Sequence, residues 1–274
     1  MFALRPAPIF TICLLVACAC CVGCAVNPVT GDEEFMLIGE QHDKKIGSRY
    51  APEIEKQMGG KLKDQALQEY INNVGQKIVR ASHRPHSGYE FAALNDSSVN
   101  AFALPGGYIY ITRGMLEKLD TEAQLAGILA HETTHVVARH TAAAMSRQIG
   151  MFLLLAGAAT AGPGADEMAA ATVTAQIIDL RYTRADEQEA DISGLNYMVR
   201  AGYNPYGMVE VMEMLQAENK DHPVEFFSTH PIPENRILYM TARIQTAFDN
   251  ADRLTVGKDD YRRNVLDGLP KESQ

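Results

Sequence analysis

The sequence predicts an α+β fold that is predominantly α-helical, and three observations carry this prediction. Apolar residues recur at three- and four-residue steps between Leu67 and Ile78, as on the buried stripe of an amphipathic helix. Residues 108–112 alternate aromatic and β-branched side chains, which is typical of a strand. From Asp120 onward the chain reads as almost entirely helical. The predicted order is therefore helices, a small sheet and then helices again.

Size and charge limit the classes of protein to which the chain can belong. With 274 residues it can bury a full-sized core as one domain. Its formal net charge is −9, and it contains no dense run of lysine and arginine. A nucleic-acid-binding surface is not expected, because such surfaces gather positive charge.

The first 24 residues hold all five cysteines and have the layout of a secretory signal. Arg5 is the only charged residue there, and an apolar run over residues 9–19 follows it before small residues take over. The run is too short to span a bilayer comfortably. Because the segment ends in small residues and cysteine, it resembles a bacterial lipoprotein signal, in which a lipidated cysteine becomes the mature N-terminus.

Two cysteines, Cys18 and Cys24, compete as the lipidation site. Cys24 is favoured, because cleavage before it discards every other thiol and leaves no unpaired cysteine in an oxidising compartment. Cleavage at Cys18 and an uncleaved membrane anchor stay open as alternatives. The expected organisation is a lipoprotein signal peptide over 1–23, an irregular tether over 24–38, the main domain over 39–248 and a polar, poorly ordered tail over 249–274.

Two helices are expected after the tether, and the apolar stripe described above marks the second. Strands are expected at 89–94, 99–104 and 108–112, because turn-forming residues separate these runs. The last of them has two open interpretations. It is either an edge on which an extended peptide adds a strand, or an interior strand of the sheet.

A histidine pair, His131 and His135, lies in a helix that is expected from about Thr121 to Arg139, with Asp120 or Thr121 as its N-cap. Residues four apart share one helical face, so the two imidazoles can converge on a single tetrahedral Zn²⁺. The five-residue pattern also arises by chance, so its surroundings have to support it.

Glu132 lies one step around the helix from His131, so it can act as a general base beside the metal without displacing a ligand. The flanking residues 125–130 and 136–137 are apolar, which places this helix in the core. Two histidines and a glutamate in the core are costly without a function. The alternative is that both histidines are hydrogen-bonded core residues that bind no metal.

Glu187 and Asp191 are candidates for a third ligand and its support. They are four apart at the start of another helix and share a face with Ala190 and Gly194, whose small size allows a close approach to the histidine helix. Glu187 would then bind zinc, and Asp191 would accept a hydrogen bond from the far nitrogen of a ligand histidine. Glu189 points roughly the opposite way. The alternative is a solvated acidic helix start, where carboxylates favour the helix dipole.

Four motifs occur in order along the chain. They occupy residues 100–107, residues 129–140, residues 187–191, and residues 229–231 with Arg236. Together they resemble the zinc peptidase family that includes the HtpX membrane proteases, the CAAX prenyl-protein proteases and the periplasmic BepA-like and LoiP-like enzymes. The resemblance extends over roughly residues 30–248.

The resemblance implies a zincin-like metalloprotease domain of the gluzincin type over 39–248, with a small β-sheet and an active-site helix. It implies one Zn²⁺ per chain, held by His131, His135 and Glu187. Glu132 is the catalytic base that this family pattern requires.

The resemblance also singles out His230 and Arg236, which lie in the family's His-Pro motif. Both are catalytic candidates for stabilising the oxyanion that develops during peptide hydrolysis. The matching histidine of BepA-like relatives can reach the metal as an inhibitory extra ligand, so His230 is alternatively a latch. His140 recurs in the family's motif as well, but its position five residues after His135 favours a structural role.

The chain lacks the membrane helices of the HtpX and CAAX branches and the C-terminal repeats of BepA, so it looks most like the short lipoprotein branch. We therefore expect a zinc endopeptidase that is lipid-anchored on the periplasmic side of the outer membrane. Its expected substrates are misfolded or misassembled outer-membrane proteins. The alternative is an envelope chaperone or assembly factor whose zinc site is latched or structural. The oligomeric state stays open.

One apolar stretch, residues 151–159, fits none of these motifs. It is apolar all round and too short to span a membrane. A buried helix is the favoured interpretation, while a lid, a contact with the lipid surface and an oligomer interface stay open.

Overall fold

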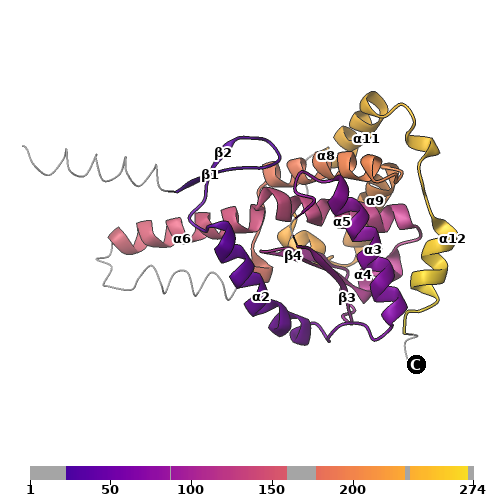
Figure 1. Ribbon diagram of the computed structural model, residues 1–274, viewed down its shortest axis with the longest axis horizontal. Helices are drawn as coiled ribbons and strands as arrows, with labels where there is room; N and C mark the ends of the chain where they lie inside the picture. Colours follow the sequence, from indigo (N-terminus) through magenta and orange to yellow (C-terminus); the bar gives the residue numbers. More distant parts are fainter. Residues whose placement is uncertain (1–22, 87, 159–176, 232–234, 271–274) are drawn as a thin grey trace, which may run out of the picture.

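The computed structural model describes residues 23–86, 88–158, 177–231 and 235–270 (Figure 1). Nearly all of the expected signal peptide lies outside the described residues. Within the described part of the chain, many helices accompany two small sheets. The predicted α+β, mainly helical class is therefore confirmed.

The larger sheet contains the three predicted strands, in the order β3-β5-β4. Its strands are β3 (Glu90–Leu94), β4 (Ala101–Leu104) and β5 (Tyr108–Thr112). β5 runs parallel to β3 and antiparallel to β4, so Ile109 lies between Phe91 and Ala103. Because β5 is paired on both sides, it offers no edge to an added peptide strand. The interior interpretation of residues 108–112 is confirmed, and the edge interpretation is wrong.

Helices cover both faces of this sheet, because alternate side chains of its strands point to opposite sides. Phe91 and Ile109 belong to a core that includes residues of α3 (Gln65–Ala81) and α5 (Glu122–Ala138). Ala92 and Tyr110 belong to a second core with α2 (Glu40–Gln57) and α6 (His140–Ala158). The predicted amphipathic helix is α3, and its N-cap Asp64 accepts a hydrogen bond from the amide of Leu67.

The C-terminal half of the chain packs further helices against α5. These are α8 (Arg184–Arg200), α9 (Tyr206–Asp221), α10 (Phe226–Thr229) and α11 (Arg236–Ala247). Gly194 allows α8 to approach closely, since a Cβ there would lie 3.3 Å from the carbonyl carbon of Ala130. The predicted close contact between these two helices is confirmed. The short α4 (Arg113–Lys118) follows β5, and the turn η1 (Ile177–Asp179) precedes α8.

Residues 24–38 differ from the irregular tether that the sequence predicted. β1 (Cys24–Val26) and β2 (Glu33–Phe35) form an antiparallel hairpin. The buried amide of Asn27 donates to Glu34 at 2.7 Å and to Glu189 of α8 at 3.0 Å. The prediction was wrong because this docking depends on a glutamate far along the chain.

The polar segment after residue 248 also packs onto the domain, contrary to the predicted loose tail. It forms η2 (Ala251–Arg253), α12 (Lys258–Tyr261) and η3 (Arg262–Leu266). Tyr261 and Val265, four residues apart, are buried, and the Tyr261 hydroxyl donates to the carbonyl of Leu116 at 2.8 Å. Apolar residues scattered through a polar sequence were too weak a signal to predict this contact.

The apolar stretch that begins at residue 151 continues α6 as far as Ala158. Met151 is 58% exposed and Phe152 is 38% exposed, so the expectation of a buried helix is wrong at these two positions. The side chains of residues 153–158 and residue 159 itself lie outside the description. No described helix is both long enough and apolar enough to cross a membrane.

Candidate metal centre

α5 carries His131, Glu132 and His135 into the core. The helix begins where the side chain of its N-cap Thr121 accepts from the amide of Gln124 at 3.1 Å, as one of the two predicted caps requires. All three site residues are buried, with Glu132 and His135 completely inaccessible. The helix therefore holds a polar face inside an apolar environment, as its flanking residues predicted.

α8 supplies the carboxylates. It begins with a capping box between Thr183 and Asp186, which fixes the direction in which its first turns point. Glu187 and Asp191 are both completely buried and face α5. Glu189 points away from them to Asn27, as predicted from its place on the helix.

Four side chains meet at one point: His131, His135, Glu187 and His230. Each offers one nitrogen or oxygen atom, and these atoms lie within 4.8 Å of one another. We call this group the metal-binding cluster. His230 follows α10, so the chain returns to α5 and α8 after a long excursion through α9.

The distances inside the cluster suit a shared metal ion. Nε2 of His131 lies 3.1 Å from Nε2 of His135 and 3.5 Å from Oε2 of Glu187. Oε1 of Glu187 lies 3.5 Å from Nε2 of His135. Ligands about 2.0–2.1 Å from a tetrahedral zinc lie roughly 3.3 Å apart, so the three predicted ligands have the spacing of a coordination shell.

The outer ring nitrogens of both helix histidines have partners of the right kind. Nδ1 of His131 lies 3.1 Å from Oδ1 of Asp191, as predicted, so it keeps its proton and leaves Nε2 free for a metal. Nδ1 of His135 lies 2.9 Å from Nδ1 of His140. A proton on the former nitrogen and a lone pair on the latter give His135 the same tautomer.

His140 therefore has a closer connection to the site than its sequence position indicated. Its other nitrogen, Nε2, lies 3.6 Å from Oε2 of Glu189, which also binds Asn27 of the hairpin. A chain of polar contacts thus runs from the ligand His135 to the N-terminal hairpin. The recurrence of His140 in the family motif was the one signal in the sequence for this chain of contacts.

Arg236 lies behind the ligands, among carboxylates. Its guanidinium donates to Oδ1 of Asp191 at 2.6 Å and lies 3.2 Å from Oε2 of Glu187. The hydroxyl of Tyr239 donates to the other oxygen of Asp191. Tyr239 was missed in the sequence, although it lies one helical turn after Arg236. Arg236 thus offsets part of the buried negative charge of α8, and the hydroxyl of Tyr239 stabilises Asp191 by a hydrogen bond.

His230 lies inside the cluster, not beside it. Its Nδ1 is 2.9 Å from Oε1 of Glu187 and 3.3 Å from Nε2 of His131. Its ring stacks on Phe226 with centroids 4.2 Å apart, and its Nε2 lies 3.6 Å from Oε1 of Glu132. His230 therefore occupies the position of a fourth ligand.

Tyr182 closes another side of the cluster and was missed in the sequence. Its ring stacks on that of His135 with centroids 3.9 Å apart. Its hydroxyl lies 3.0 Å from that of Thr141, and burial strongly raises its pKa. It is therefore a neutral wall of the site.

A buried polar atom that makes no hydrogen bond can be satisfied by a metal ion, or by a water molecule bound to one. Both carboxylate oxygens of Glu132 and Oε2 of Glu187 are buried atoms of this kind. Two imidazoles and a buried carboxylate form the donor set that catalytic zinc prefers. The residues therefore fit a zinc ion, and Glu132 stays outside the ligand set.

The electrostatics agree with this division of roles. Burial disfavours charge on Glu187, but His230, His131 and His135 outweigh it and hold its pKa well below the ordinary value. Burial raises the pKa of Glu132, with His230 and His131 opposing the shift. Burial lowers the pKa of His135 well below its ordinary value, which suits a neutral ligand.

His131 differs from His135 in this respect. Burial lowers its pKa, but hydrogen bonds to Asp191 and Glu187 outweigh this and raise the pKa to about 9. A metal ion at Nε2 would take the place of the second proton of the ring, while the proton on Nδ1 would stay with Asp191 as its acceptor.

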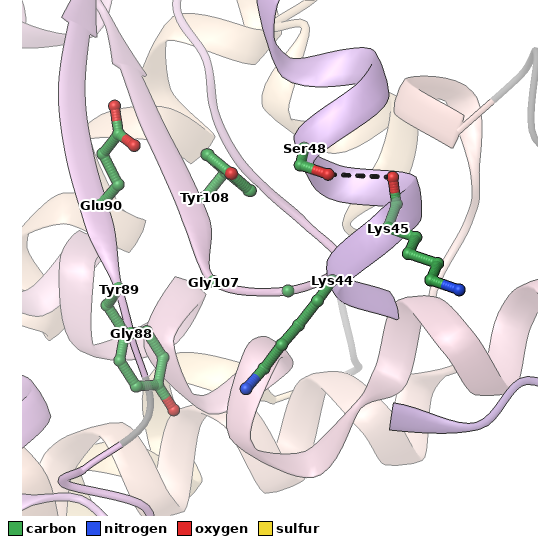
Figure 2. A pocket seen from close by; sticks show the side chains of 9 residues that line it. Lys44, Lys45, Ser48, Gly88, Tyr89, Glu90, Gly107 and Tyr108 are labelled. Carbon is green, nitrogen blue, oxygen red and sulfur yellow. Dashed lines mark hydrogen bonds between the residues drawn. The ribbon is translucent and has the colours of Figure 1, made fainter. Parts of the chain in front are cut away.

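An open cavity lies apart from the cluster, between α2 and the first residues of β3 and β5 (Figure 2). Its volume is about 530 Å³. Figure 2 shows Lys44 reaching across it towards Tyr89, while Lys45 points away. No residue of the metal-binding cluster lines this cavity, so the cavity is not where the metal chemistry belongs.

Comparison with known proteins agrees with the geometry of the cluster. The beta-barrel assembly-enhancing protease of Escherichia coli (strain K12) is 33% identical over 189 residues, which cover 64% of this chain and 38% of that protein. The mitochondrial metalloendopeptidase OMA1 of Schizosaccharomyces pombe is 28% identical over 216 residues, which cover 77% of this chain and 63% of that protein. The protein of the same name from Saccharomyces cerevisiae is 28% identical over 252 residues, which cover 84% of this chain and 72% of that protein.

The match to the Escherichia coli relative thus spans well under half of that relative's length. The family model that matches is that of peptidase family M48, over residues 65–244. This range is more than half of the chain and includes every member of the metal-binding cluster. The resemblance to zinc metallopeptidases is therefore confirmed: the chain belongs to peptidase family M48.

Proposed function

We propose that the protein is a zinc-dependent endopeptidase of the bacterial cell envelope that degrades misfolded or misassembled outer-membrane proteins. The observation that carries the enzymatic part is the convergence of His131, His135 and Glu187 beside a buried Glu132 whose carboxylate makes no hydrogen bond. A structural zinc site has no use for such a carboxylate, because an uncompensated buried acid is costly.

When bound, zinc supplies the Lewis acidity that activates water and polarises the scissile carbonyl. Glu132 takes the proton of the attacking water on Oε1 or Oε2 and passes it to the leaving amine. Neither oxygen is committed to another hydrogen bond. The raised pKa of Glu132 suits this role, because it brings the carboxyl nearer to the pH at which it must exchange protons.

Arg236 and Asp191 keep the ligands in place in this proposal. Arg236 bonds to Asp191 and pairs with Glu187, so it neutralises charge and fixes both carboxylates. We assign it to positioning instead of to the oxyanion, because its side chain is buried and pairs with these two carboxylates. His230 is the residue that can face the substrate carbonyl once its ring leaves the cluster.

The envelope location and the substrate class have separate support. One relative is named a beta-barrel assembly-enhancing protease, and this name supports the substrate class that we propose. The relatives named mitochondrial metalloendopeptidase act in another compartment, so the family alone does not fix the location. The export-type segment before Cys24, with Cys24 exposed at the start of β1, favours lipid anchoring in the bacterial envelope.

Cleavage of unfolded casein by the purified full chain tests the enzymatic proposal. We expect cleavage to stop on chelation, to return with zinc, and to be lost in Glu132→Gln. Glu213→Gln, an exposed glutamate on α9, is the matched control and should keep full activity. Activity that survives both chelation and Glu132→Gln would refute the mechanism.

The substrate class needs a different experiment. Cells that lack the gene and carry the Glu132→Gln chain should accumulate misassembled outer-membrane proteins, and these should co-purify with the inactive chain. Cells that carry the Glu213→Gln chain should not accumulate them. Equal levels in both strains would refute the substrate class and leave the peptidase activity standing.

A latched site is a second candidate, and one observation favours it. His230 is completely buried within the cluster, 2.9 Å from Glu187, in the position that a substrate group would need. An enzyme in this state cleaves little until His230 moves. If His230 is a latch, His230→Ala should raise casein cleavage, whereas a fall in cleavage would assign His230 to catalysis.

A further inference from the structure

Exposed apolar side chains gather in two neighbouring segments of the molecule. Of the seven large hydrophobic side chains that are exposed in the described part of the chain, five lie in the N-terminal segment 24–37 or in α6. They are Val26, Phe35, Leu37, Met151 and Phe152, with exposed fractions from 38% to 60%, and we call them the apolar patch. Such a concentration marks a surface that is covered in use.

Contacts join the two segments into one surface. A Cβ on Gly150 of α6 would lie 3.4 Å from the ring of Phe35, and the amide of Leu37 donates to the hydroxyl of Ser146 at 2.9 Å. Figure 1 shows α6 extending out of the body on the side where the hairpin lies. The patch therefore belongs to one face of the molecule.

The register of the hairpin places Cys24 within this surface. Cys24 and Phe35 are direct partners across the β1–β2 pair, so their side chains share one face. That face is exposed, whereas Ala25 and Glu34 point to the body and are half-buried. The residue that is expected to carry the lipid is thus the nearest cross-strand neighbour of an exposed phenylalanine.

We propose that the apolar patch rests on the lipid bilayer, beside the point at which the N-terminal lipid anchor enters it. This inference rests on the proposed anchoring at Cys24. Paired residues in an antiparallel hairpin lie about 5 Å apart, so Phe35 cannot be far from a bilayer that holds the lipid of Cys24. A second copy of the chain would have to displace that bilayer to cover the same side chains.

The charge distribution along α6 supports a bilayer as the occupant. Arg147 is the last charged residue of the helix, and no charged residue follows it before Asp166. The helix therefore passes from a charged part near the body to an uncharged outer part. We place the contact at the bilayer surface, at the depth of interfacial side chains.

This arrangement limits the distance between the metal-binding cluster and the membrane. α6 begins at His140, which touches His135, and reaches the patch at Met151. Eleven residues of helix rise about 16 Å, so the cluster lies within roughly 20 Å of the patch. The enzyme would then act on chains that lie close to the membrane surface.

Single tryptophans test the proposal, because the chain contains none. Phe35→Trp and Phe152→Trp place the probe in the patch, and Leu238→Trp places it at a 66% exposed apolar position of α11 as the matched control. Each full-length variant is reconstituted into phosphatidylcholine vesicles with plain acyl chains or with acyl chains brominated near the headgroup. We expect roughly twofold quenching by bromine for the two patch probes and almost none for the control, given an interfacial depth of about 5–10 Å.

Two outcomes would overturn the proposal. One is equal, weak quenching at all three positions, which would show that the patch faces water. The other is blue-shifted patch emission without bromine quenching, which would assign the patch to contact with a second copy. Casein cleavage by the same variants in detergent reports the enzymatic activity separately, so a failed membrane contact and a failed peptidase are distinguishable.

Discussion

His131 and His135 can bind a metal only while their outer ring nitrogens keep a proton. For His131, Asp191 is the acceptor, and Arg236 and Tyr239 hold that carboxylate in place. We predict that Asp191→Asn weakens zinc binding by about 10- to 100-fold, because the acceptor loses its charge. Competition against a fluorescent chelator measures this.

The matched control for that experiment is Asp221→Asn, which changes an exposed aspartate at the end of α9. It should leave zinc affinity unchanged. If Asp191→Asn also binds zinc with the affinity of the parent chain, Asp191 does not position His131.

His140 is predicted to play the same part for His135. Removing its ring in His140→Ala takes away the acceptor 2.9 Å from Nδ1 of His135. We expect weaker zinc binding, about 10-fold or more, with the exposed His222→Ala as the control. A lower melting temperature with unchanged zinc affinity would instead assign His140 to the stability of the fold.

Among the elements, α5 depends on glycines where it meets α9. A Cβ on Gly127 would lie 2.9 Å from Cα of Met208, and one on Gly207 would lie 2.6 Å from the carbonyl carbon of Ala123. We predict that Gly127→Ala lowers the free energy of unfolding by about 1–3 kcal/mol, because backbone has to move. The gain in helix propensity, about 1 kcal/mol, only partly offsets this.

Urea unfolding measures the effect, and Gly88→Ala is the control because nothing lies within 4 Å of its Cβ position. The control should change stability by less than about 0.5 kcal/mol. Equal stability of the Gly127→Ala chain and the parent chain would show that the two helices can separate at little cost.

The elements that the sequence predicted well are those with a strong local period. The apolar stripe of α3 and the alternation of β5 gave both elements within a few residues. Their neighbours in space were not predictable. Whether β5 was an edge depended on the parallel pairing with β3, and the hairpin at 24–38 depended on Glu189. The local pattern of apolar residues thus predicts whether a segment is a helix or a strand. Which other segments pack against it depends on residues that are distant in the sequence.

Across the whole molecule, the convergence of His131 and His135 was predictable because they lie four residues apart on one helix, while the place of Glu187 beside them followed mainly from the family resemblance. His140 was not, because an ideal helix would turn it away from His135. α5 ends at Arg139, which has a left-handed backbone with φ of 62°, and the chain then starts α6 in a new direction. Because of this break, the ring of His140 lies against that of His135. A helical-wheel projection assumes one continuous helix, so it does not predict this contact.

The metal also joins parts of the fold that are far apart in sequence. Its proposed ligands come from α5 and α8, with His230 from the segment after α10. Without a metal, Glu187 and His131 keep buried charge whose compensation depends on Arg236 and neighbouring histidines. Chelation should therefore loosen the contact between α5 and α8 as well as stop catalysis.

We predict that chelation lowers the melting temperature of the parent chain by roughly 5–10 °C. Free zinc at 100 times its dissociation constant stabilises a folded protein by about 3 kcal/mol, and a domain of this size shifts by about 2–4 °C per kcal/mol. Glu132→Gln should show the same shift without any activity, because Glu132 stays outside the ligand set. Chelation should lower the melting temperature of the Glu187→Gln chain much less, because this chain lacks one of the proposed zinc ligands. If chelation left the melting temperature of the parent chain unchanged, the four side chains would hold no ion that the fold depends on.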